Sequence, residues 1–169
     1  MPKSASPSQR HDSASAVVRL LTKRKWTLAT AESCTGGLIA DKITDVPGAS
    51  KVFSGGIVAY SNDVKEKFLG VSNDSLKKIG AVSEAVAREM AQGARKKFGA
   101  DFAMATTGIA GPAGGTKSKP VGTVFIAVAG KSKTIVVRKL NSFSRKKFKE
   151  ITARQALQLL LEQLQQVYP

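Results

Sequence analysis

The chain has 169 residues, 42% of them hydrophobic, and its formal net charge is +15 at pH 7. That hydrophobic content excludes a disordered chain, and no run of about 18 apolar residues is present to span a membrane. The single cysteine, Cys34, cannot form an internal disulfide, and residues 1–10 are too polar for a signal peptide. We therefore expect a cytoplasmic protein without a membrane partner.

Helices and strands are expected to alternate along most of the chain. Residues 1–13 read as a loose polar tail, and residues 14–169 as a single domain. Apolar spacing and glycine or proline punctuation indicate the element boundaries. In chain order, we expect a helix over 14–25, a strand over 26–31, a helix opened by Gly36 and Gly37 and stopped by Pro47, a strand over 52–60, helices over 62–69, 73–79 and 84–98, a strand over 102–107, a hairpin of strands 121–129 and 134–140, and a helix over 148–167. This order predicts a three-layer α/β/α domain with a mixed sheet.

The residue types available exclude several kinds of active site. The only histidine, His11, lies in the expected tail, so a Ser-His-Asp or Cys-His site cannot be built inside the domain. Metal sites rich in histidine or cysteine are excluded for the same reason. The 12 acidic residues form no obvious cluster, and we expect neither a metal nor another cofactor.

Three polar segments follow expected strands, at residues 30–37, 60–65 and 106–115. Ligands of open α/β sheets bind at the carboxyl ends of the strands, and helix N-termini there favour anions. Each segment also has a plainer interpretation, as helix caps, a solvated helix face and a flexible surface loop respectively. For Cys34 we favour a small buried residue over a nucleophile, because it has no base partner.

Basic residues gather in two groups, at 23–25 and at 131–149. Few aromatic residues interleave them, so a stacking platform for single-stranded nucleic acid is not indicated. A solvated basic surface is the favoured interpretation, and a phosphate-bearing ligand is the next. A nucleic-acid partner remains possible but is not favoured.

Five motifs resemble, in order and spacing, the CinA carboxy-terminal domain family of bacterial nicotinamide mononucleotide deamidases. They are A-E-S-C-T-G-G at 31–37, G-G-I-V-A-Y-S-N at 55–62, G-A-V-S-E at 80–84, T-G-I-A-G-P-A-G-G at 107–115 and K-P-V-G-T-V at 119–124. The resemblance covers about residues 14–165. It implies a five-stranded mixed sheet and hydrolysis of the substrate carboxamide to nicotinate mononucleotide and ammonia. A homo-oligomer, with a dimer favoured, is also expected.

The resemblance also implies the site residues. The catalytic serine of the family falls on Ser33, and its supporting polar residues fall on Ser50, Tyr60, Lys65 and Thr107. The expected substrate-binding residues are Thr35, Gly36, Gly37, Gly108, Gly111 and Arg145. Arg145 stands in for the arginine of an F-S-G-D-R-like segment, which here reads F-S-R-K-K-F at 143–148.

These residues suggest a route for amide hydrolysis. Ser33 would attack the carboxamide, and either Lys65 or Tyr60 would accept its proton, since no histidine is at hand. Backbone N–H groups at the start of the 35–37 helix would hold the oxyanion. Two other functions stay open, a catalytically inactive nucleotide-binding regulatory module and a basic nucleic-acid-associated protein.

Overall fold

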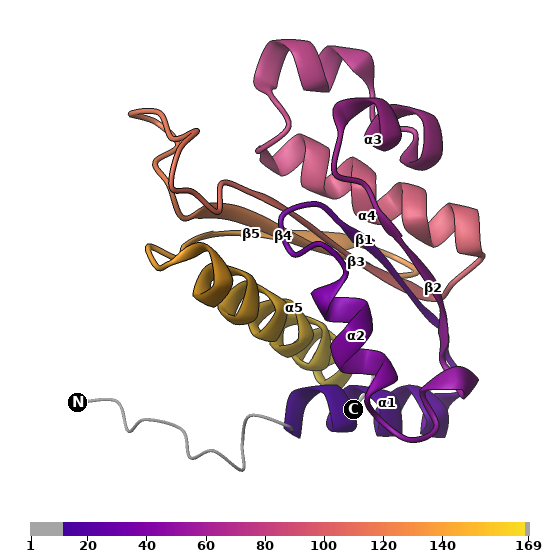
Figure 1. Cartoon of the computed structure of the whole chain (residues 1–169). Helices are drawn as coiled ribbons and strands as arrows, with labels where there is room; N and C mark the ends of the chain where they lie inside the picture. Colours follow the sequence, from indigo (N-terminus) through magenta and orange to yellow (C-terminus); the bar gives the residue numbers. More distant parts are fainter. Residues whose placement is uncertain (1–11, 168–169) are drawn as a thin grey trace.

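The computed structural model describes residues 12–167, which form one five-stranded sheet between two layers of helices (Figure 1). The elements are α1 (Asp12–Arg24), β1 (Leu28–Glu32), α2 (Leu38–Thr44), η2 (Ala49–Lys51), β2 (Phe53–Val58), α3 (Asn62–Leu69), η3 (Ser75–Ile79), α4 (Glu84–Phe98), β3 (Phe102–Gly108), β4 (Thr123–Ala129), β5 (Thr134–Leu140) and α5 (Arg145–Val167). The expected three-layer fold with a five-stranded mixed sheet is confirmed.

The sheet has the strand order β2-β1-β3-β4-β5. Strand β1 pairs in parallel with both β2 and β3, whereas β4 runs antiparallel to β3 and to β5. All of the residues of β1 and β4 are buried, as expected of central strands covered on both faces. The carboxyl ends of β1 and β3 therefore meet at one end of the sheet, and their amino ends meet at the other.

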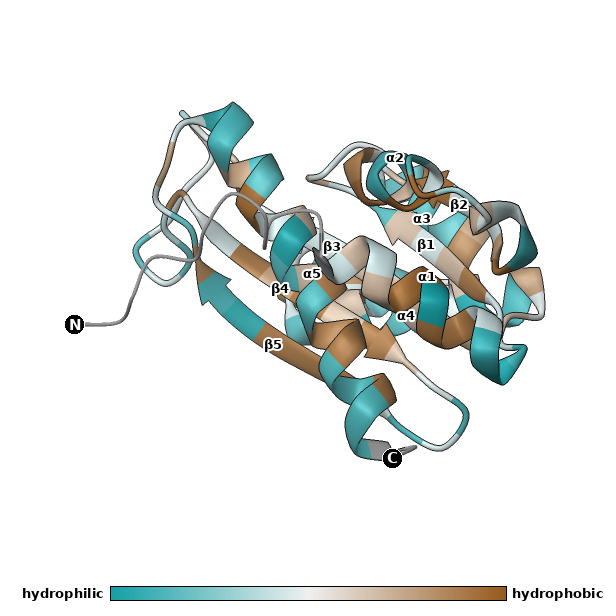
Figure 2. Ribbon diagram, turned by 90° about the horizontal axis from the view of Figure 1, so that it is seen from below, coloured by the Kyte–Doolittle hydropathy of each residue, from teal (hydrophilic) through white to brown (hydrophobic). Residues whose placement is uncertain are grey.

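Two apolar cores flank the sheet. Helices α1, α2 and α5 cover one face, and α3 and α4 cover the other (Figure 1). On the first face, Leu21 and Leu160 belong to the same cluster as Met104 of β3. On the second face, Met90 of α4 packs with alanines of β1 and β3. In Figure 2 apolar residues run along β4 and the first part of β5, while the end of β5 is hydrophilic.

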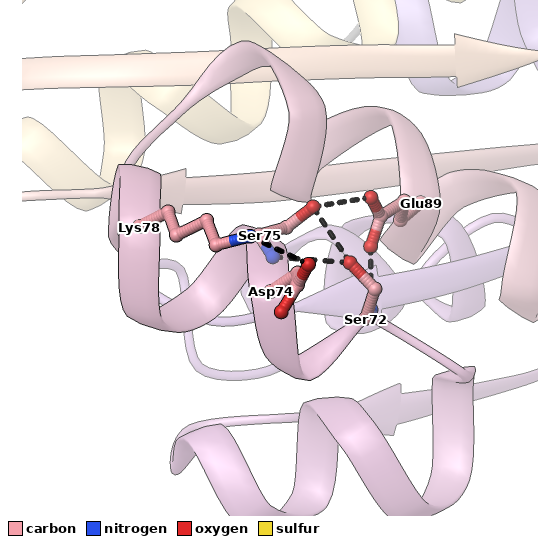
Figure 3. Close-up of polar contacts among 5 residues, drawn as sticks. All are labelled: Ser72, Asp74, Ser75, Lys78 and Glu89. Carbon is pink, nitrogen blue, oxygen red and sulfur yellow. Dashed lines mark hydrogen bonds and ion pairs between the residues drawn. The ribbon is translucent and has the colours of Figure 1, made fainter.

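Close packing and hydrogen bonds fix the helices of the second face to one another. A Cβ at Gly93 of α4 would collide with the backbone carbonyl of Leu69 at the end of α3, so the two helices touch through backbone. Figure 3 shows Glu89 of α4 accepting hydrogen bonds from the Ser72 N–H and the Ser75 hydroxyl, both at 2.6 Å. These contacts seat the segment that follows α3 on α4.

Several element boundaries differ from the expected ones by one to three residues, and three of them illustrate the differences. Helix α1 begins at Asp12, two residues earlier than expected, and residues 1–11, with His11, lie outside the described residues. Strand β1 begins at Leu28 rather than at residue 26, because the Thr27 N–H bonds the Asp101 carboxylate instead of a neighbouring strand. Helix α5 begins at Arg145 rather than at 148, because the Phe148 N–H already bonds the Ser144 carbonyl at 2.8 Å.

Candidate functional site

A cavity of about 300 Å³ opens at the carboxyl ends of β1 and β3. Its walls come from the turn after β1, the segment from Tyr60 into α3, the residues before α4, the loop after β3 and the start of α5. The lining residues are Ser33, Cys34, Tyr60, Asn62, Lys65, Ala81, Val82, Thr107, Gly108, Ile109, Ala110, Gly111, Ala113, Gly114 and Arg145. Seven of the residues expected at the site therefore share one cavity: Ser33, Tyr60, Lys65, Thr107, Gly108, Gly111 and Arg145.

Ser33 is the first residue after β1 and lies in the cavity wall. Its N–H donates to the Thr106 carbonyl of β3 at 3.0 Å, and its carbonyl accepts from the Gly36 N–H at 3.1 Å. Gly36 and Gly37 have φ of 61° and 99°, a left-handed conformation that favours glycine. The two glycines thus allow the tight turn that holds the Ser33 backbone between the strand end and α2.

Glu32 is the residue of this turn that sequence reasoning missed. Its side chain is only 1% exposed, and it accepts hydrogen bonds from the Gly37, Ile39 and Ala40 N–H groups at 3.1, 3.0 and 2.9 Å. It also accepts a 2.6 Å bond from the Thr35 hydroxyl. The first N–H groups of α2 are therefore already occupied by a carboxylate of the same chain.

Three of the expected substrate-binding residues take part in this turn and lie outside the cavity wall. Thr35 is fully buried between Glu32 and the Thr106 hydroxyl, 2.8 Å away, and does not line the cavity. Gly36 and Gly37 shape the turn but are also absent from the cavity wall, and the Gly37 N–H cannot hold an oxyanion while it bonds Glu32. Thr35, Gly36 and Gly37 are thus structural neighbours of the cavity and are not exposed to a substrate in it.

Lys65 is an unusually buried lysine. Helix α3 begins after Ser61, whose hydroxyl accepts from the Val64 N–H, and its first turn carries Lys65 beneath the surface. The residue is 2% exposed, and its ammonium donates to the Tyr60 carbonyl at 3.1 Å. Burial lowers the pKa of Lys65 from its ordinary value of 10.5, because a desolvated ammonium is disfavoured. This lysine is therefore closer to a neutral base than a surface lysine is.

Arg145 and Tyr60 close the outer side of the cavity. The Arg145 guanidinium, at the start of α5, donates to the Gly111 carbonyl at 2.9 Å and to the Tyr60 hydroxyl at 2.6 Å. Tyr60 is itself 59% exposed. One turn further along α5, the Lys149 ammonium would be 3.5 Å from a Cβ at Gly36. Two cations of α5 thus lie beside the loop after β3 and the turn after β1.

Thr107 and Cys34 complete the inner wall. The Thr107 hydroxyl donates to the Ala81 carbonyl at 2.8 Å, which ties β3 to the segment before α4. Cys34 is 6% exposed, and burial raises the pKa of its thiol to about 12. A thiol with that pKa is almost wholly protonated at neutral pH and is a poor nucleophile.

Ser50 is the one expected catalytic residue that the structure does not bring to the cavity. It lies exposed in η2, just before β2 and hence at the amino end of that strand. Strand β2 is parallel to β1, so Ser50 and Ser33 lie toward opposite ends of the sheet. Within one chain, Ser50 cannot contact a ligand that lies against Ser33.

Among the described residues, no group of three or more histidine, cysteine, aspartate or glutamate side chains could hold a metal ion. In the same part of the chain, no helix is long and apolar enough to cross a membrane.

The fold and the cavity define an α/β domain with a serine and a buried lysine in one cavity at the carboxyl ends of parallel strands. The family model of the CinA C-terminal domain matches residues 10–164, and the chain belongs to that family. The resemblance found in the sequence motifs is therefore confirmed.

Curated relatives carry general names. A "putative competence-damage inducible protein" of Thermoanaerobacter pseudethanolicus is 52% identical over 144 residues, covering 85% of this chain and 35% of the relative. A "CinA-like protein" of Thermotoga maritima is 61% identical over 112 residues, covering 66% and 28%. The chain thus spans about a third of the length of the curated relatives it matches.

Solved structures have the same fold over nearly their whole length. The competence/damage inducible protein CihA of Agrobacterium tumefaciens is 38% identical with a TM-score of 0.90, covering 97% of this chain and 100% of that one. A competence damage-inducible protein A of Klebsiella pneumoniae is 35% identical with a TM-score of 0.89, covering 93% and 98%.

Proposed function

We propose that this protein is an amidohydrolase that converts nicotinamide mononucleotide to nicotinate mononucleotide and ammonia. The observation that carries the proposal is the cavity that Ser33 and Lys65 share, because its wall contains both a buried lysine of lowered pKa and a serine that follows a strand end. Family membership supports the same activity, because the resemblance implies that Ser33 is the catalytic serine and that Lys65 is one of its supporting polar residues.

The proposed reaction has two halves. In the first, neutral Lys65 takes the Ser33 hydroxyl proton as the Ser33 Oγ attacks the carboxamide carbon, and the same proton then goes to the leaving nitrogen, which departs as ammonia. In the second, a water gives a proton to Lys65 and attacks the nicotinoyl ester. The C–Oγ bond breaks, the proton returns to Ser33, and nicotinate mononucleotide leaves.

Backbone groups beside Ser33 suit the oxyanion of each tetrahedral intermediate. Among the residues that the structure describes, Cys34 lines the cavity and has an N–H group that bonds no carbonyl or side chain of another residue, whereas the Gly36 and Gly37 N–H groups are occupied. Such donors typically contribute about 3 kcal/mol each to transition-state stabilisation. Tyr60, whose hydroxyl bonds Arg145, is assigned to orienting the substrate, and Thr107 to holding the cavity wall.

The nucleotide phosphate is assigned to the cations of α5. Glu32 neutralises the start of α2, so that helix offers no anion site. Arg145 lines the cavity, and the Lys149 ammonium lies beside Gly36 in the turn that follows Ser33. The guanidinium of an arginine can donate two parallel hydrogen bonds to one phosphate. Gly108 and Gly111 lie in the wall of the same cavity, along which the nucleotide would extend from Ser33 toward Arg145.

Ammonia release from the purified protein tests the proposal. Nicotinamide mononucleotide, nicotinamide riboside and free nicotinamide would be compared at equal concentration. We expect turnover that is fastest with the mononucleotide, because only it reaches both the Ser33 end and the α5 cations. If the mononucleotide binds by calorimetry but releases no ammonia, the protein is a nucleotide-binding module and the proposed hydrolysis is wrong.

A further inference from the structure

The end of the sheet opposite the cavity gathers segments that are distant in the sequence. The amino ends of β1 and β3 lie there, together with the turn between β4 and β5, because β4 runs antiparallel to β3. The last turns of α1 and α4, which lead into β1 and β3, lie at the same end. We call this region the basic face, and its cations are Lys23, Arg24, Lys25, Arg95, Lys96, Lys131 and Lys133.

Contacts around Trp26 and Asp101 join these cations into one surface. Arg24 and Lys131 both approach the ring of Trp26, at 5.7 and 5.6 Å from its centroid. Lys131 pairs with Asp101 at 3.0 Å, and Arg95 donates to the Asp101 carbonyl at 3.0 Å. The three basic segments, from α1, α4 and the β4–β5 turn, are therefore neighbours in space.

Helix dipoles explain only part of this charge. Cations in the last turns of α1 and α4 interact favourably with the helix C-termini, so Lys23 and Lys96 have a structural reason to be present. Lys131 and Lys133 follow a strand and cap no helix. Asp101 pairs with Lys131 within the basic face, and among the described residues Lys96 and Lys133 form no ion pair.

The basic face is also hollowed. A cavity of about 250 Å³ lies between the last turns of α4 and the β4–β5 turn, lined by Gln92, Arg95, Lys96, Ala129, Gly130, Lys131, Ser132, Lys133 and Thr134. Four of these side chains are cationic, and Ser132 and Thr134 add hydroxyl groups. A phosphate group fits this chemistry, because it accepts hydrogen bonds from cations and hydroxyls alike.

We propose that the basic face binds the phosphodiester backbone of a nucleic acid without reading its sequence. The spread of cations over three segments suits a chain of phosphates better than one small anion. An anionic membrane suits it less, because the exposed large apolar side chains (Val58, Tyr60, Phe68, Ile79, Leu140 and Phe143) lie on other segments. This surface is separate from the candidate active site and does not depend on the proposed hydrolysis.

Two variants of equal charge test the proposal. The first changes Lys23, Lys96, Lys131 and Lys133 to Gln, and the control changes Lys77, Lys117, Lys139 and Arg154, all exposed and elsewhere, to Gln. Each lowers the formal charge of +15 by the same four units. Binding of a labelled random-sequence DNA duplex is measured by anisotropy over a salt series, with thermal melting to verify folding.

We expect the first variant to weaken binding by about 10- to 100-fold. The slope of log K against log salt should also become shallower, by about 1 for each phosphate that the variant no longer neutralises. The control should keep a slope near that of the parent. Equal weakening in both variants would show that only net charge matters and would overturn the proposal. Absence of DNA binding at low salt, or binding confined to anionic vesicles, would overturn it as well.

Discussion

The two ends of the sheet use charged residues in opposite ways. At the carboxyl end, Glu32 and Lys65 are almost fully buried, and each is held by hydrogen bonds to backbone groups. At the amino end, Lys131 and Lys133 are exposed, and Asp101 forms a partly exposed ion pair. Burial of a charge destabilises the fold unless the group is bonded, so the charges of the carboxyl end need fixed partners. The amino end keeps its charges in water, where they attract ligands without needing a fixed position.

The difference indicates what each end can do. A lysine held at one place with a lowered pKa suits proton transfer at one atom, as the proposed reaction of Ser33 requires. Exposed lysines on a turn suit many weak contacts with a polyanion. Variants should therefore have sharp, chemical effects at the carboxyl end and graded, salt-dependent effects at the amino end.

The largest effect is expected for Ser33→Ala. Removing the nucleophile should lower kcat for ammonia release by about 10³-fold or more, with little change in folding, since only one small hydroxyl is removed. The matched control is Cys34→Ala, next in sequence and also in the cavity wall, which should keep most of the activity because the pKa of its thiol is about 12. Steady-state kinetics on both variants checks this. The reverse pattern would exchange the roles of the two residues.

The second-largest effect on turnover is expected for Lys65→Met. It should decrease kcat by about 10²- to 10⁴-fold, which is the usual contribution of a general base. In the parent, kcat should rise with pH through the lowered pKa of Lys65, below its ordinary 10.5. Tyr60→Phe should cost less, because Tyr60 accepts the Lys65 hydrogen bond through its backbone carbonyl. Near-normal turnover of Lys65→Met would remove lysine from the mechanism.

The same lysine should affect stability against pH. Between its lowered pKa and 10.5, the unfolded chain binds more protons at this position than the folded chain does. The free energy of unfolding contributed by Lys65 should therefore rise with pH across that window. Urea denaturation of the parent and of Lys65→Met at several alkaline pH values checks the sign, and the variant should lack this rise.

A smaller effect, on stability, is expected for Glu32→Gln. The amide nitrogen cannot accept, so at least one N–H of Gly37, Ile39 or Ala40 is left without its acceptor, which costs about 2–3 kcal/mol. The control at the amino end is Asp101→Asn, which should cost under about 1 kcal/mol because that pair is partly exposed. Chemical denaturation measures both. Equal destabilisation would contradict the contrast between the two ends.

Local sequence signals predicted the helices and strands more completely than they predicted the candidate site. Helices Asn62–Leu69 and Glu84–Phe98 have the expected bounds, because Ser61 and Ser83 are clear N-caps and Gly70 and Gly99 end the helices. Helix α5 begins three residues before its expected start, since apolar periodicity cannot detect a first turn made of basic residues. The family resemblance implies roles for Ser33 and Lys65, which share the cavity. It also implies a role for Ser50, which lies toward the other end of the sheet, because a resemblance in sequence does not say which end of a strand a residue occupies.

Glu32 escaped prediction for a physical reason. A carboxylate after a strand looks like a ligand group, and only the three-dimensional turn shows that α2 folds back onto it. The signal available in the sequence was the pair Gly36-Gly37 close behind an acid, which allows backbone N–H groups to converge on a carboxylate. The burial of Lys65 had no comparable signal, since its neighbours in α3 are mostly polar.

The close approach of Gly93 to Leu69 means that a substitution outside the cavity can disturb the candidate active site. Any side chain at position 93 would push against the Leu69 carbonyl, and Leu69 ends the short helix that begins near Lys65. A random mutagenesis screen for impaired turnover should therefore recover substitutions at Gly93, which touches no wall of the cavity. A redesigned sequence could therefore keep every cavity residue and still lose activity, because replacing Gly93 would shift α3 and with it the side chain of Lys65.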